Sequence, residues 1–575
     1  MRLAFLSASA GVLTVWAAPA LSAQLASEIA ALHRDGQTFV TWREAPQIGV
    51  RYRVYRSPVP ILSEVKLRAS DLLGEVDDKS SRNQERSQVE RGERTWVIAE
   101  GAPPLGASQG LFVHTVEGDQ AAVFYAVTSV KGGLENRTLA SGRNATVVAL
   151  SELAAPPLPV LQGREGSREV WGHWVGDRDT PYLPALSLTP SHAFDFAFEP
   201  GLASGPRGLL LRLHPAGGNY ATGWPPRALV PQDVDVLAPS DLHPTTGYTF
   251  FFGAHERFPG QPEGSTRVWC FTQERLLWTL GWMSAHLGGA LDAERVSVAG
   301  SSLGATGGMY LVEERPDLFS AALLRNGNFD LQAGDLDDIR VFEKLYGRFA
   351  LDLPMRSGLT VLERTNARTM ANLAPAVDWP VIRTLNGRAD TRVGWASAVG
   401  LFAGLDETFR PSASYFDDHT HSSKGYWSPL ERTLVQRTCQ VRRDRPSLRF
   451  SACTLDDDAG NGSRTSGDTI GTLGGRVDYD PETAASAPGW VRFDVFVRDE
   501  GALDDAAIAR GQAVLTPRRT GSFVPAPGES VYFTLREGAD LLEEHWLLAD
   551  ELGLVHTPPV PLSTTRREAR FELSP

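Results

Sequence analysis

A serine between two glycines is the strongest chemical signal in the sequence. Residues 300–304 read Gly-Ser-Ser-Leu-Gly, after the mostly apolar stretch Val296–Ala299 and before a run rich in small residues. A serine at the tip of a sharp strand-to-helix turn needs glycine two positions before and after it, because side chains there would collide. The pattern predicts Ser302 as a nucleophile, and the alternative is a glycine-rich turn with a structural role only.

A second glycine-rich loop lies upstream of this serine. His214-Pro-Ala-Gly-Gly218 follows the apolar run Gly208–Leu213. Beside a nucleophile turn, such a loop supplies one N–H of an oxyanion hole, and the residue after the nucleophile supplies the other. We expect the donors to be Leu303 and either Ala216 or Gly217, and we expect His214 itself to be structural.

An acid is expected after the next strand. Val381-Ile-Arg-Thr-Leu385 reads as a strand and runs into a loop that carries Asp390. That loop falls at the carboxyl edge of a parallel sheet, where such sites are built. Asp417 or Asp418 could replace Asp390 as the acid, but groups so close to the candidate histidines rarely span two loops.

Two histidines, His419 and His421, follow a further strand. The order Ser302, Asp390, His421 matches a known order of nucleophile, acid and base along the chain. We predict His421 as the base and keep His419 as the alternative. His421 then takes the Ser302 proton, the alkoxide attacks an ester or amide carbonyl, and water hydrolyses the acyl-enzyme while Asp390 holds the imidazole.

This chemistry needs neither a cofactor nor a metal. The acidic stretch 456–462 lacks the spacing of a calcium loop and is expected to be a solvated turn. Trp224, Trp395 and Trp427, with Tyr426, lie near the predicted site in sequence. They could line a substrate, and ordinary core packing is at least as good an explanation.

The elements that must position these residues alternate between strand and helix over residues 205–434. This alternation predicts an α/β domain with a mostly parallel, doubly wound sheet. Residues 331–375 have helical periodicity, interrupt the order and read as an inserted cap.

Period-two alternation dominates both flanks of that domain. It predicts β-sandwiches over residues 24–150 and 435–575, and residues 151–204 read as a Pro-rich linker and entry segment. Residues 79–95 are highly polar and are expected to form a long surface loop.

Residues 24–150 resemble a fibronectin type III domain. The resemblance rests on the strings TFVTWRE, YRVYRSP and VFYAVTSVKGGLEN, with Trp42 as the core tryptophan and Tyr125 in the strand of the tyrosine corner. It covers about 120 residues.

Residues 205–430 resemble the α/β-hydrolases of the prolyl-oligopeptidase and polyhydroxybutyrate-depolymerase-like group. The matching strings are LHPAGG, LDAERVSVAGSSLGATGGMYLVEERPDLFSAAL, LNGRAD and FDDHTH. The resemblance covers about 40% of the chain and implies the α/β-hydrolase fold and serine hydrolase chemistry. No β-propeller precedes the domain, unlike in that group's oligopeptidases, and this difference favours an esterase.

The composition of the chain argues against one class of binding partner. The chain has 575 residues and a formal net charge of −13, which argues against nucleic acid, because phosphate binding needs a basic face. It has three cysteines; Cys439 and Cys453 could form a disulfide or remain free, and Cys270 is expected to be a buried thiol.

The N-terminus predicts the compartment. Residues 1–23 combine Arg2, an apolar run and a small-residue end, as a secretory signal peptide does. No other run is apolar enough to cross a membrane. The leading hypothesis is therefore a secreted or periplasmic serine esterase acting on bulky or polymeric esters. A secreted serine peptidase is the second hypothesis, and a non-catalytic surface-binding protein on a hydrolase scaffold is the third.

Overall fold

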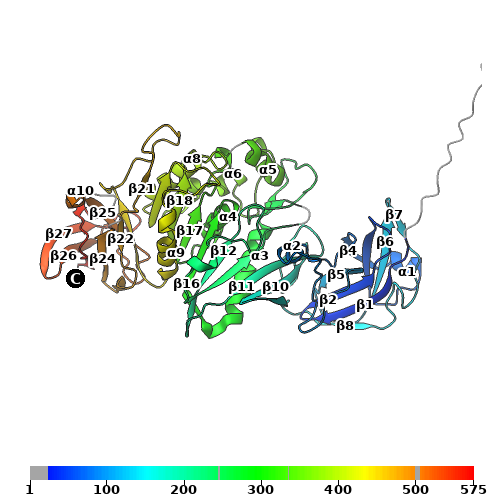
Figure 1. The fold of residues 1–575 in the computed structure, drawn as a ribbon. Coiled ribbons are helices and arrows are strands. Elements are labelled where there is room, and N and C mark those ends of the chain that lie inside the picture. Colours follow the sequence, from blue (N-terminus) through cyan, green and yellow to red (C-terminus); the bar gives the residue numbers. More distant parts are fainter. Residues whose placement is uncertain (1–23, 244–245, 335, 499–504, 575) are drawn as a thin grey trace, which may run out of the picture.

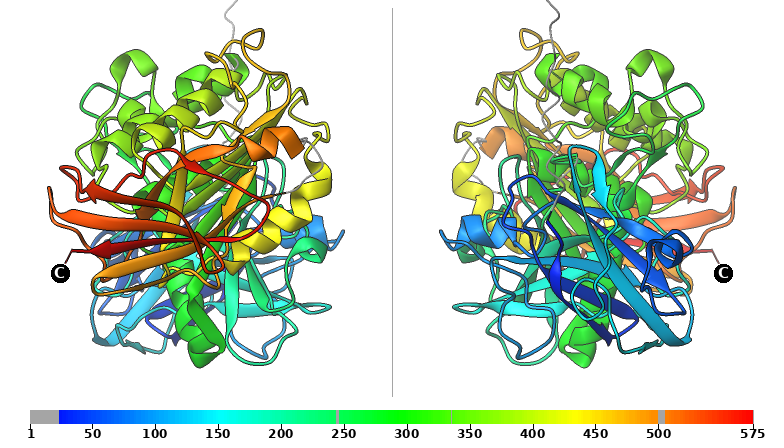
Figure 2. Two further views of the ribbon diagram at one scale, coloured as in Figure 1. Left: turned by 90° about the vertical axis from the view of Figure 1, so that its left-hand side faces the viewer. Right: turned by 90° about the vertical axis from the view of Figure 1, so that its right-hand side faces the viewer.

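The three parts of the chain lie in a row. The computed structural model describes residues 24–243, 246–334, 336–498 and 505–574. The N-terminal and C-terminal sheets lie at opposite ends of a central α/β body (Figure 1), and the end-on views of Figure 2 show one set of sheets in front of it on each side. The predicted signal peptide lies outside the described residues. Within the described ranges, no helix is both long and apolar enough to span a bilayer.

One ten-stranded sheet forms the centre, in the order β21-β19-β18-β17-β16-β12-β13-β11-β10-β9. The six strands from β19 to β13 are parallel, and the outer pairs are antiparallel. The bounds are β9 Val160–Glu165, β10 Arg168–Val175, β11 His192–Glu199, β12 Arg207–Leu213, β13 Val234–Pro239, β16 Leu291–Ser301, β17 Ala321–Arg325, β18 Val381–Gly387, β19 Ser412–Asp417 and β21 Gly471–Leu473.

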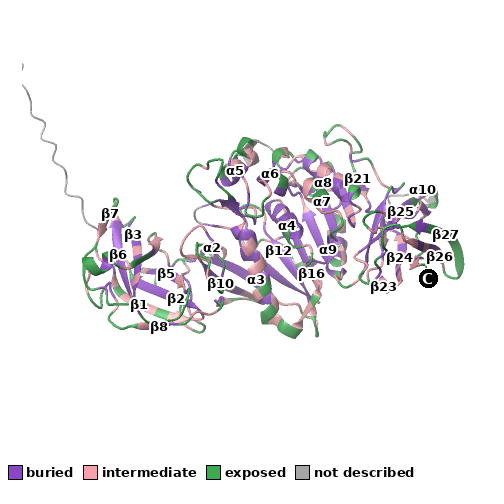
Figure 3. Ribbon diagram, turned by 180° about the vertical axis from the view of Figure 1, so that it is seen from behind, coloured by how far each residue is buried: buried purple, intermediate pink, exposed green. Residues whose placement is uncertain are grey.

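Helices cover both faces of this sheet, which explains why its strands are apolar on consecutive residues. Leu209 and Leu211 of β12 pack in one cluster with helices α3 (Phe271–Leu287) and α4 (Leu303–Glu314). Leu210, between them, packs on the other side with α9 (Glu431–Gln440). Figure 3 shows the central strands as buried along most of their length.

The segment predicted as an inserted cap is helical. It contains α5 (Leu336–Tyr346), α6 (Val361–Arg364) and α7 (Ala367–Leu373), followed after β18 by α8 (Trp395–Glu407). Arg364 of α6 is buried and donates to Glu313 of α4 at 2.5 Å. The segment is therefore tied to the helix that follows the nucleophile turn.

Two predicted boundaries differ from the structure. The stretch 151–204, predicted as a linker, supplies β9, β10 and β11 of the central sheet. The domain predicted to end at 434 continues through α9, and β21 from the C-terminal part adds an edge strand beside β19. Edge strands pair through tertiary contacts that local composition does not encode.

The N-terminal part holds two sheets around one apolar core. A three-stranded sheet has the order β1-β2-β5, and a second sheet has the order β4-β3-β6-β7 with β8 beside β6. Trp42 and Tyr125 are fully buried in the shared core. The likeness to fibronectin type III stays a prediction. The bounds are β1 Ser27–Arg34, β2 Gln37–Arg43, β3 Arg51–Ser57, β4 Asp71–Val76, β5 Gln109–Thr115, β6 Gln120–Lys131, β7 Leu134–Asn136, β8 Leu150–Glu152 and α1 Glu64–Arg68.

The polar segment 79–95 is not simply a surface loop, as the sequence had predicted. It contains helix α2 (Gln84–Val89), which begins at the side-chain cap of Asn83. Asn83, Glu85 and Ser87 are buried, and the Asn83 amide donates to Asp195 of β11 at 2.8 Å. Asn83 can be buried here because the central sheet offers it a partner, and Ser87 donates to the Asn83 carbonyl of its own segment at 2.5 Å.

The C-terminal part also holds two sheets around a shared core. Arg518 and Arg519 anchor it by donating to backbone carbonyls of the central domain, including Thr408 at 3.1 Å and Phe319 at 2.8 Å. The bounds are β20 Ser447–Ser451, β22 Val477–Tyr479, β23 Ala485–Ala487, β24 Trp490–Val497, β25 Gln512–Arg518, β26 Ser530–Glu537, β27 Asp540–Leu548, β28 Val560–Pro561, β29 Arg567–Leu573 and α10 Asp505–Ala509.

The three cysteines are free thiols. Cys439 lies on α9 in the central core and Cys453 lies in the C-terminal core, so the disulfide alternative is wrong.

Candidate active site

Ser302 sits on the turn that joins β16 to α4. Its φ of +56° is uncommon for a residue with a side chain. A Cβ on Gly300 would lie 2.3 Å from the backbone of Gly304, and a Cβ on Gly304 would lie 2.7 Å from the Leu213 carbonyl oxygen. Both glycines are therefore required by close backbone contacts, as the sequence pattern had predicted.

Three side chains from three loops meet at this turn. His421 Nε2 lies 2.8 Å from Ser302 Oγ, and its Nδ1 lies 2.6 Å from Asp390 Oδ2. The structure thus brings together the three residues that the sequence singled out. The serine and the histidine are partly exposed and the aspartate is 1% exposed.

The buried carboxyl of Asp390 is held in one orientation. Its Oδ1 accepts the backbone N–H of Arg392 at 2.9 Å and that of Val393 at 3.4 Å. Oδ2 is left to face the imidazole, so Nδ1 of His421 carries the proton and Nε2 presents its lone pair to the serine hydroxyl.

The predicted oxyanion donors come from two segments that meet at the nucleophile turn. Leu303 is the first residue of α4, where an N–H has no acceptor within its own helix. Ala216 and Gly217 lie in the loop after β12 and are exposed, and this loop begins at the carbonyls that touch Gly304. The loop after β12 and the first residue of α4 therefore both lie at the turn that carries Ser302.

His214 has a structural place. Its Nδ1–H donates to the Pro215 carbonyl at 2.9 Å, and its Nε2 accepts the N–H of Asp241 at 3.0 Å. Burial lowers its pKa to about 4. Both ring nitrogens are occupied, so His214 fixes the loop that precedes Ala216.

His419 makes its side-chain hydrogen bonds with Asp417 and Asn326, and His421 makes the one with Ser302. His419 Nδ1 contacts the Asp417 carboxylate and its Nε2 lies 3.1 Å from Asn326 Oδ1. The same Asn326 oxygen accepts the Gly387 N–H at 3.1 Å, which sets the orientation of the amide. Both nitrogens of His419 therefore face oxygens, and the geometry favours His421 over His419 as the base.

Asp417 and Asn326 hold the loop that carries His421. Asp417 also accepts the N–H of His419 at 3.0 Å and the N–H of Tyr426. Burial by itself would raise the pKa of Asp417, but these hydrogen bonds, with that from the His419 ring first, lower it below its ordinary value. The Asn326 amide donates to the His421 carbonyl at 3.4 Å.

Sequence reasoning missed Asn326. It has a φ of +49° and follows β17 directly. The available signal was the Asn-Gly-Asn string after a buried strand, because asparagine tolerates the left-handed region in turns.

Two of the predicted substrate-lining tryptophans are core residues. The indole N–H of Trp395 donates to the Ala459 carbonyl at 3.1 Å, and that of Trp427 donates to the Phe416 carbonyl at 3.0 Å. Both rings are buried, so assigning them to the substrate surface was wrong. Trp224 is also largely buried but keeps an unpartnered indole N–H, and Tyr426 is exposed.

Carboxylates of the acidic stretch 456–462 accept hydrogen bonds from backbone N–H groups of the neighbouring segment 472–474. Asp456 accepts the Gly474 N–H at 2.6 Å, and Asp457 accepts the Thr472 N–H at 2.8 Å. No group of three His, Cys, Asp or Glu side chains in the described ranges is placed to hold a metal ion.

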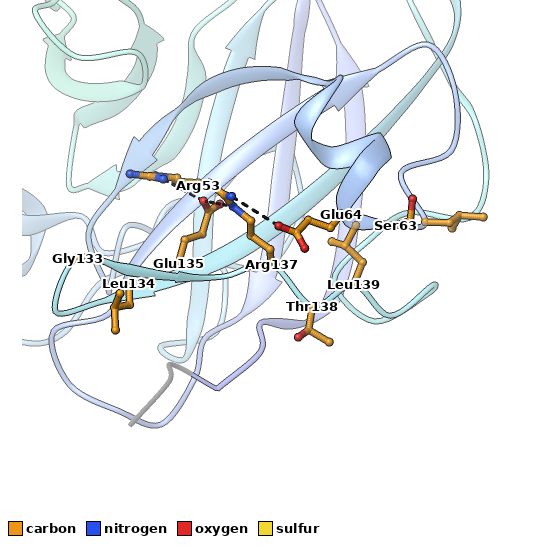
Figure 4. Close-up of a pocket in the computed structure, with 10 residues that line it drawn as sticks. Arg53, Ser63, Glu64, Gly133, Leu134, Glu135, Arg137, Thr138 and Leu139 are labelled. Atoms are coloured by element: carbon orange, nitrogen blue, oxygen red, sulfur yellow. Dashed lines mark hydrogen bonds and ion pairs between the residues drawn. The ribbon is translucent and has the colours of Figure 1, made fainter. Parts of the chain in front are cut away.

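A cavity of about 690 Å³ lies in the N-terminal sheets, and Ser302 is not among its lining residues. Figure 4 shows that its charged groups pair with one another. The Glu135 carboxylate forms ion pairs with Arg53 at 3.0 Å and with Arg137 at 2.9 Å. The charged side chains that line this cavity are therefore already paired with one another.

Comparison with known proteins gives weak likenesses. No protein-family model and no curated protein matches the sequence. An S-formylglutathione hydrolase from Agrobacterium tumefaciens is similar at a TM-score of 0.36 and 14% identity, over 49% of this chain and 98% of that one. An acylaminoacyl peptidase from Pyrococcus horikoshii is similar at 0.32 and 11%, over 72% and 54%. A ferulic acid esterase is similar at 0.32 and 14%, over 48% and 98%.

These likenesses are too distant to carry an argument about substrate. The class follows from the chain itself. A mostly parallel sheet is covered on both faces, and a serine stands on a strained turn between its central strand β16 and helix α4. This is the architecture of an α/β-hydrolase.

Proposed function

We propose that the protein is a serine hydrolase that cleaves carboxylic esters through an acyl-enzyme. The observation that carries the proposal is the continuous hydrogen-bond chain from Asp390 through His421 to Ser302, at 2.6 and 2.8 Å. A nucleophile within hydrogen-bond reach of a base that a third group orients is the signature of covalent catalysis.

Each residue has one role in the proposed mechanism. His421 Nε2 takes the Ser302 proton as Oγ attacks the carbonyl carbon, and Asp390 stabilises the imidazolium that forms. His421 then returns the proton to the leaving alcohol. In the second half, water attacks the acyl carbon as His421 takes its proton; the bond from the acyl carbon to Ser302 Oγ then breaks, the acid leaves, and His421 returns the proton to Oγ.

The oxyanion is assigned to backbone donors. Leu303 N–H and the N–H of Ala216 or Gly217 stabilise the charge that develops on the carbonyl oxygen. Leu303 lies at the N-terminus of the 12-residue helix α4, whose dipole adds to this stabilisation. A lost oxyanion donor costs about 3 kcal/mol of barrier.

An ester is the proposed substrate, of a bulky or polymeric kind, and the proposed compartment is secreted or periplasmic. The partial exposure of Ser302 and His421 supports access by a substrate from solvent. The flanking sheets are proposed as β-sandwiches, the first of fibronectin type III kind, supported by the strand order and buried Trp42.

One assay separates the esterase from its two alternatives. Purified protein is given a p-nitrophenyl acyl ester and a peptide p-nitroanilide, with Ser302→Ala as control. Ester cleavage that disappears in the variant supports the proposal. Amide cleavage without ester cleavage points to a peptidase. Activity that survives Ser302→Ala contradicts the nucleophile, and inactivity on both, with no labelling by a fluorophosphonate, points to a non-catalytic scaffold.

A further inference from the structure

A cavity of about 430 Å³ lies where the N-terminal part of the chain meets the central sheet. One wall comes from residues 75–85 and Trp96, and the other comes from Trp174 of β10 and residues 191–195 at the start of β11. Figure 1 shows α2 beside this end of the sheet. Junctions between domains are frequent places for small-molecule sites.

A carboxyl without a partner lies in the wall of this cavity. Glu85, in the first turn of α2, is 7% exposed. Neither of its carboxyl oxygens has a hydrogen-bond partner in the described structure. A buried carboxyl is normally hydrogen-bonded or paired, because removing it from water otherwise costs free energy. Glu85 therefore marks a missing partner.

A second carboxyl stands close by and also lacks a cation. Asp195 is 2% exposed, and its Oδ1 accepts the Asn83 amide at 2.8 Å. The nearby Arg275 donates to the Ser240 carbonyl at 2.6 Å and lies 3.5 Å over the Phe194 ring. Its charge acts on Glu85 without a described ion pair between the two side chains. Among the described ion pairs, none joins a cation to Glu85 or to Asp195.

The electrostatics agree with a missing cation. Burial, followed by the charge of Asp195, raises the pKa of Glu85 well above its ordinary value, and the opposing effects of the Ser240 side chain and the Arg275 charge do not offset this rise. Burial raises the pKa of Asp195 to about 7. Five carboxyl groups line the cavity, against three permanently charged bases and one histidine: Glu75, Asp77, Asp78, Glu85 and Asp195 against Arg51, Lys79, Arg82 and His192. Burial lowers the pKa of His192 well below its ordinary value.

Aromatic rings complete the wall. Trp96 and Trp174 meet edge to face with centroids 5.4 Å apart, and tryptophan faces attract organic cations. No trio of His, Cys, Asp or Glu in the described ranges is placed to hold a metal ion. Carboxyls beside indole rings are the chemistry that recognises an ammonium group.

We propose that this cavity binds an organic ammonium group, with Glu85 and Asp195 as the counter-charges and Trp96 and Trp174 as the apolar walls. The site goes beyond the proposed hydrolysis and does not depend on it. It lies on the catalytic edge of the sheet, because Ser240, just after β13, donates to the Asp195 carbonyl at 3.1 Å. Strands β12 and β13 separate it from β16, so it is about 15 Å from Ser302 at about 4.8 Å per strand.

Calorimetric titration of the full chain with phenethylammonium tests the proposal. The neutral 2-phenylethanol and the anion 3-phenylpropionate serve as shape-matched probes. The variants are Glu85→Gln and Asp195→Asn, which keep side-chain size. Glu93→Gln is the matched control, since Glu93 is an exposed glutamate of the same segment that does not line the cavity.

We expect one phenethylammonium per chain, at least tenfold weaker binding in Glu85→Gln and in Asp195→Asn, and no change in Glu93→Gln. Without ligand, the unfolding midpoint of Glu85→Gln should equal or exceed that of the parent, because an unpaired buried carboxyl has been removed. Equal binding of the neutral probe, no binding of the ammonium, unchanged affinity in both variants, or a lowered midpoint in Glu85→Gln would each overturn the proposal. Loss of ester hydrolysis in Ser302→Ala with intact ammonium binding separates this site from the catalytic one.

Discussion

Replacing Asp390 by asparagine tests the geometry of the site most sharply. The Asp390 oxygen Oδ1 accepts two backbone N–H groups, from Arg392 and Val393. In Asp390→Asn the amide oxygen must stay there, because an NH₂ group in that place would face two donors. The NH₂ group then points at Nδ1 of His421, 2.6 Å from the present Oδ2 position.

The Asp390→Asn exchange therefore stabilises the wrong tautomer of His421. An NH₂ group that donates to Nδ1 places the imidazole proton on Nε2, and Nε2 then cannot accept the proton of Ser302. In a serine protease the same exchange lowers kcat about 10⁴-fold. At 1.36 kcal/mol per tenfold, this loss is about 5.5 kcal/mol of activation free energy. We expect a loss of that order here with an unchanged fold.

The assay is kcat/KM for a p-nitrophenyl ester, with circular dichroism and the unfolding midpoint as checks on folding. Asp417→Asn is the matched control, because Asp417 contacts His419 and the Tyr426 N–H but not His421. It should lose at most about 10²-fold, the cost of a small misplacement of the loop. A folded Asp390→Asn protein that loses less than tenfold, or an equal loss in Asp417→Asn, would refute the reasoning.

Three further predictions concern the same site and its supports. His421→Ala should lose about 10⁴-fold or more in kcat, whereas His419→Ala should lose at most about 10²-fold and keep the pH profile of kcat/KM; equal losses would contradict the assignment of His421 over His419 and leave the base unresolved. Gly304→Ala should lower kcat because its Cβ would lie 2.7 Å from a backbone carbonyl, whereas Gly281→Ala, with open space in helix α3, should keep full activity; equal activity in the two variants would show that the turn tolerates a side chain. The pKa of Asp195 is raised to about 7, so the unfolded chain releases this proton first, and the free energy of unfolding should fall as pH rises from about 4 toward 7; Asp195→Asn should flatten urea-unfolding midpoints over that range, and an unchanged slope would contradict it.

The catalytic residues of the candidate site were predictable because a short sequence pattern around each of them indicates its role. Gly300 and Gly304 flank a serine after a buried strand, and Asp390 and His421 follow strands that must share one edge of a parallel sheet. Chain order then assigned the roles. The choice between His419 and His421 needed the structure, since both lie on one loop and only three-dimensional contacts with Asn326 and Asp417 separate them.

Other features could not be read locally. Helix α2 looks like a surface loop because Asn83, Glu85 and Ser87 are polar, and their burial depends on β11, more than 100 residues further on. Strands β9 to β11 follow a Pro-rich stretch and join the sheet through pairing that composition does not record. Trp395 and Trp427 lie near the site in sequence but point their indole groups into the core.

The central claim is that Ser302 carries the acyl group. Rapid mixing with a p-nitrophenyl ester, followed by acid quench and mass spectrometry of proteolytic peptides, tests it directly. We expect a burst of one p-nitrophenol per chain and an acyl mass on the peptide that contains Ser302, both absent from Ser302→Ala. Turnover of the ester with no acyl adduct on that peptide, or with the adduct on another residue, would contradict it.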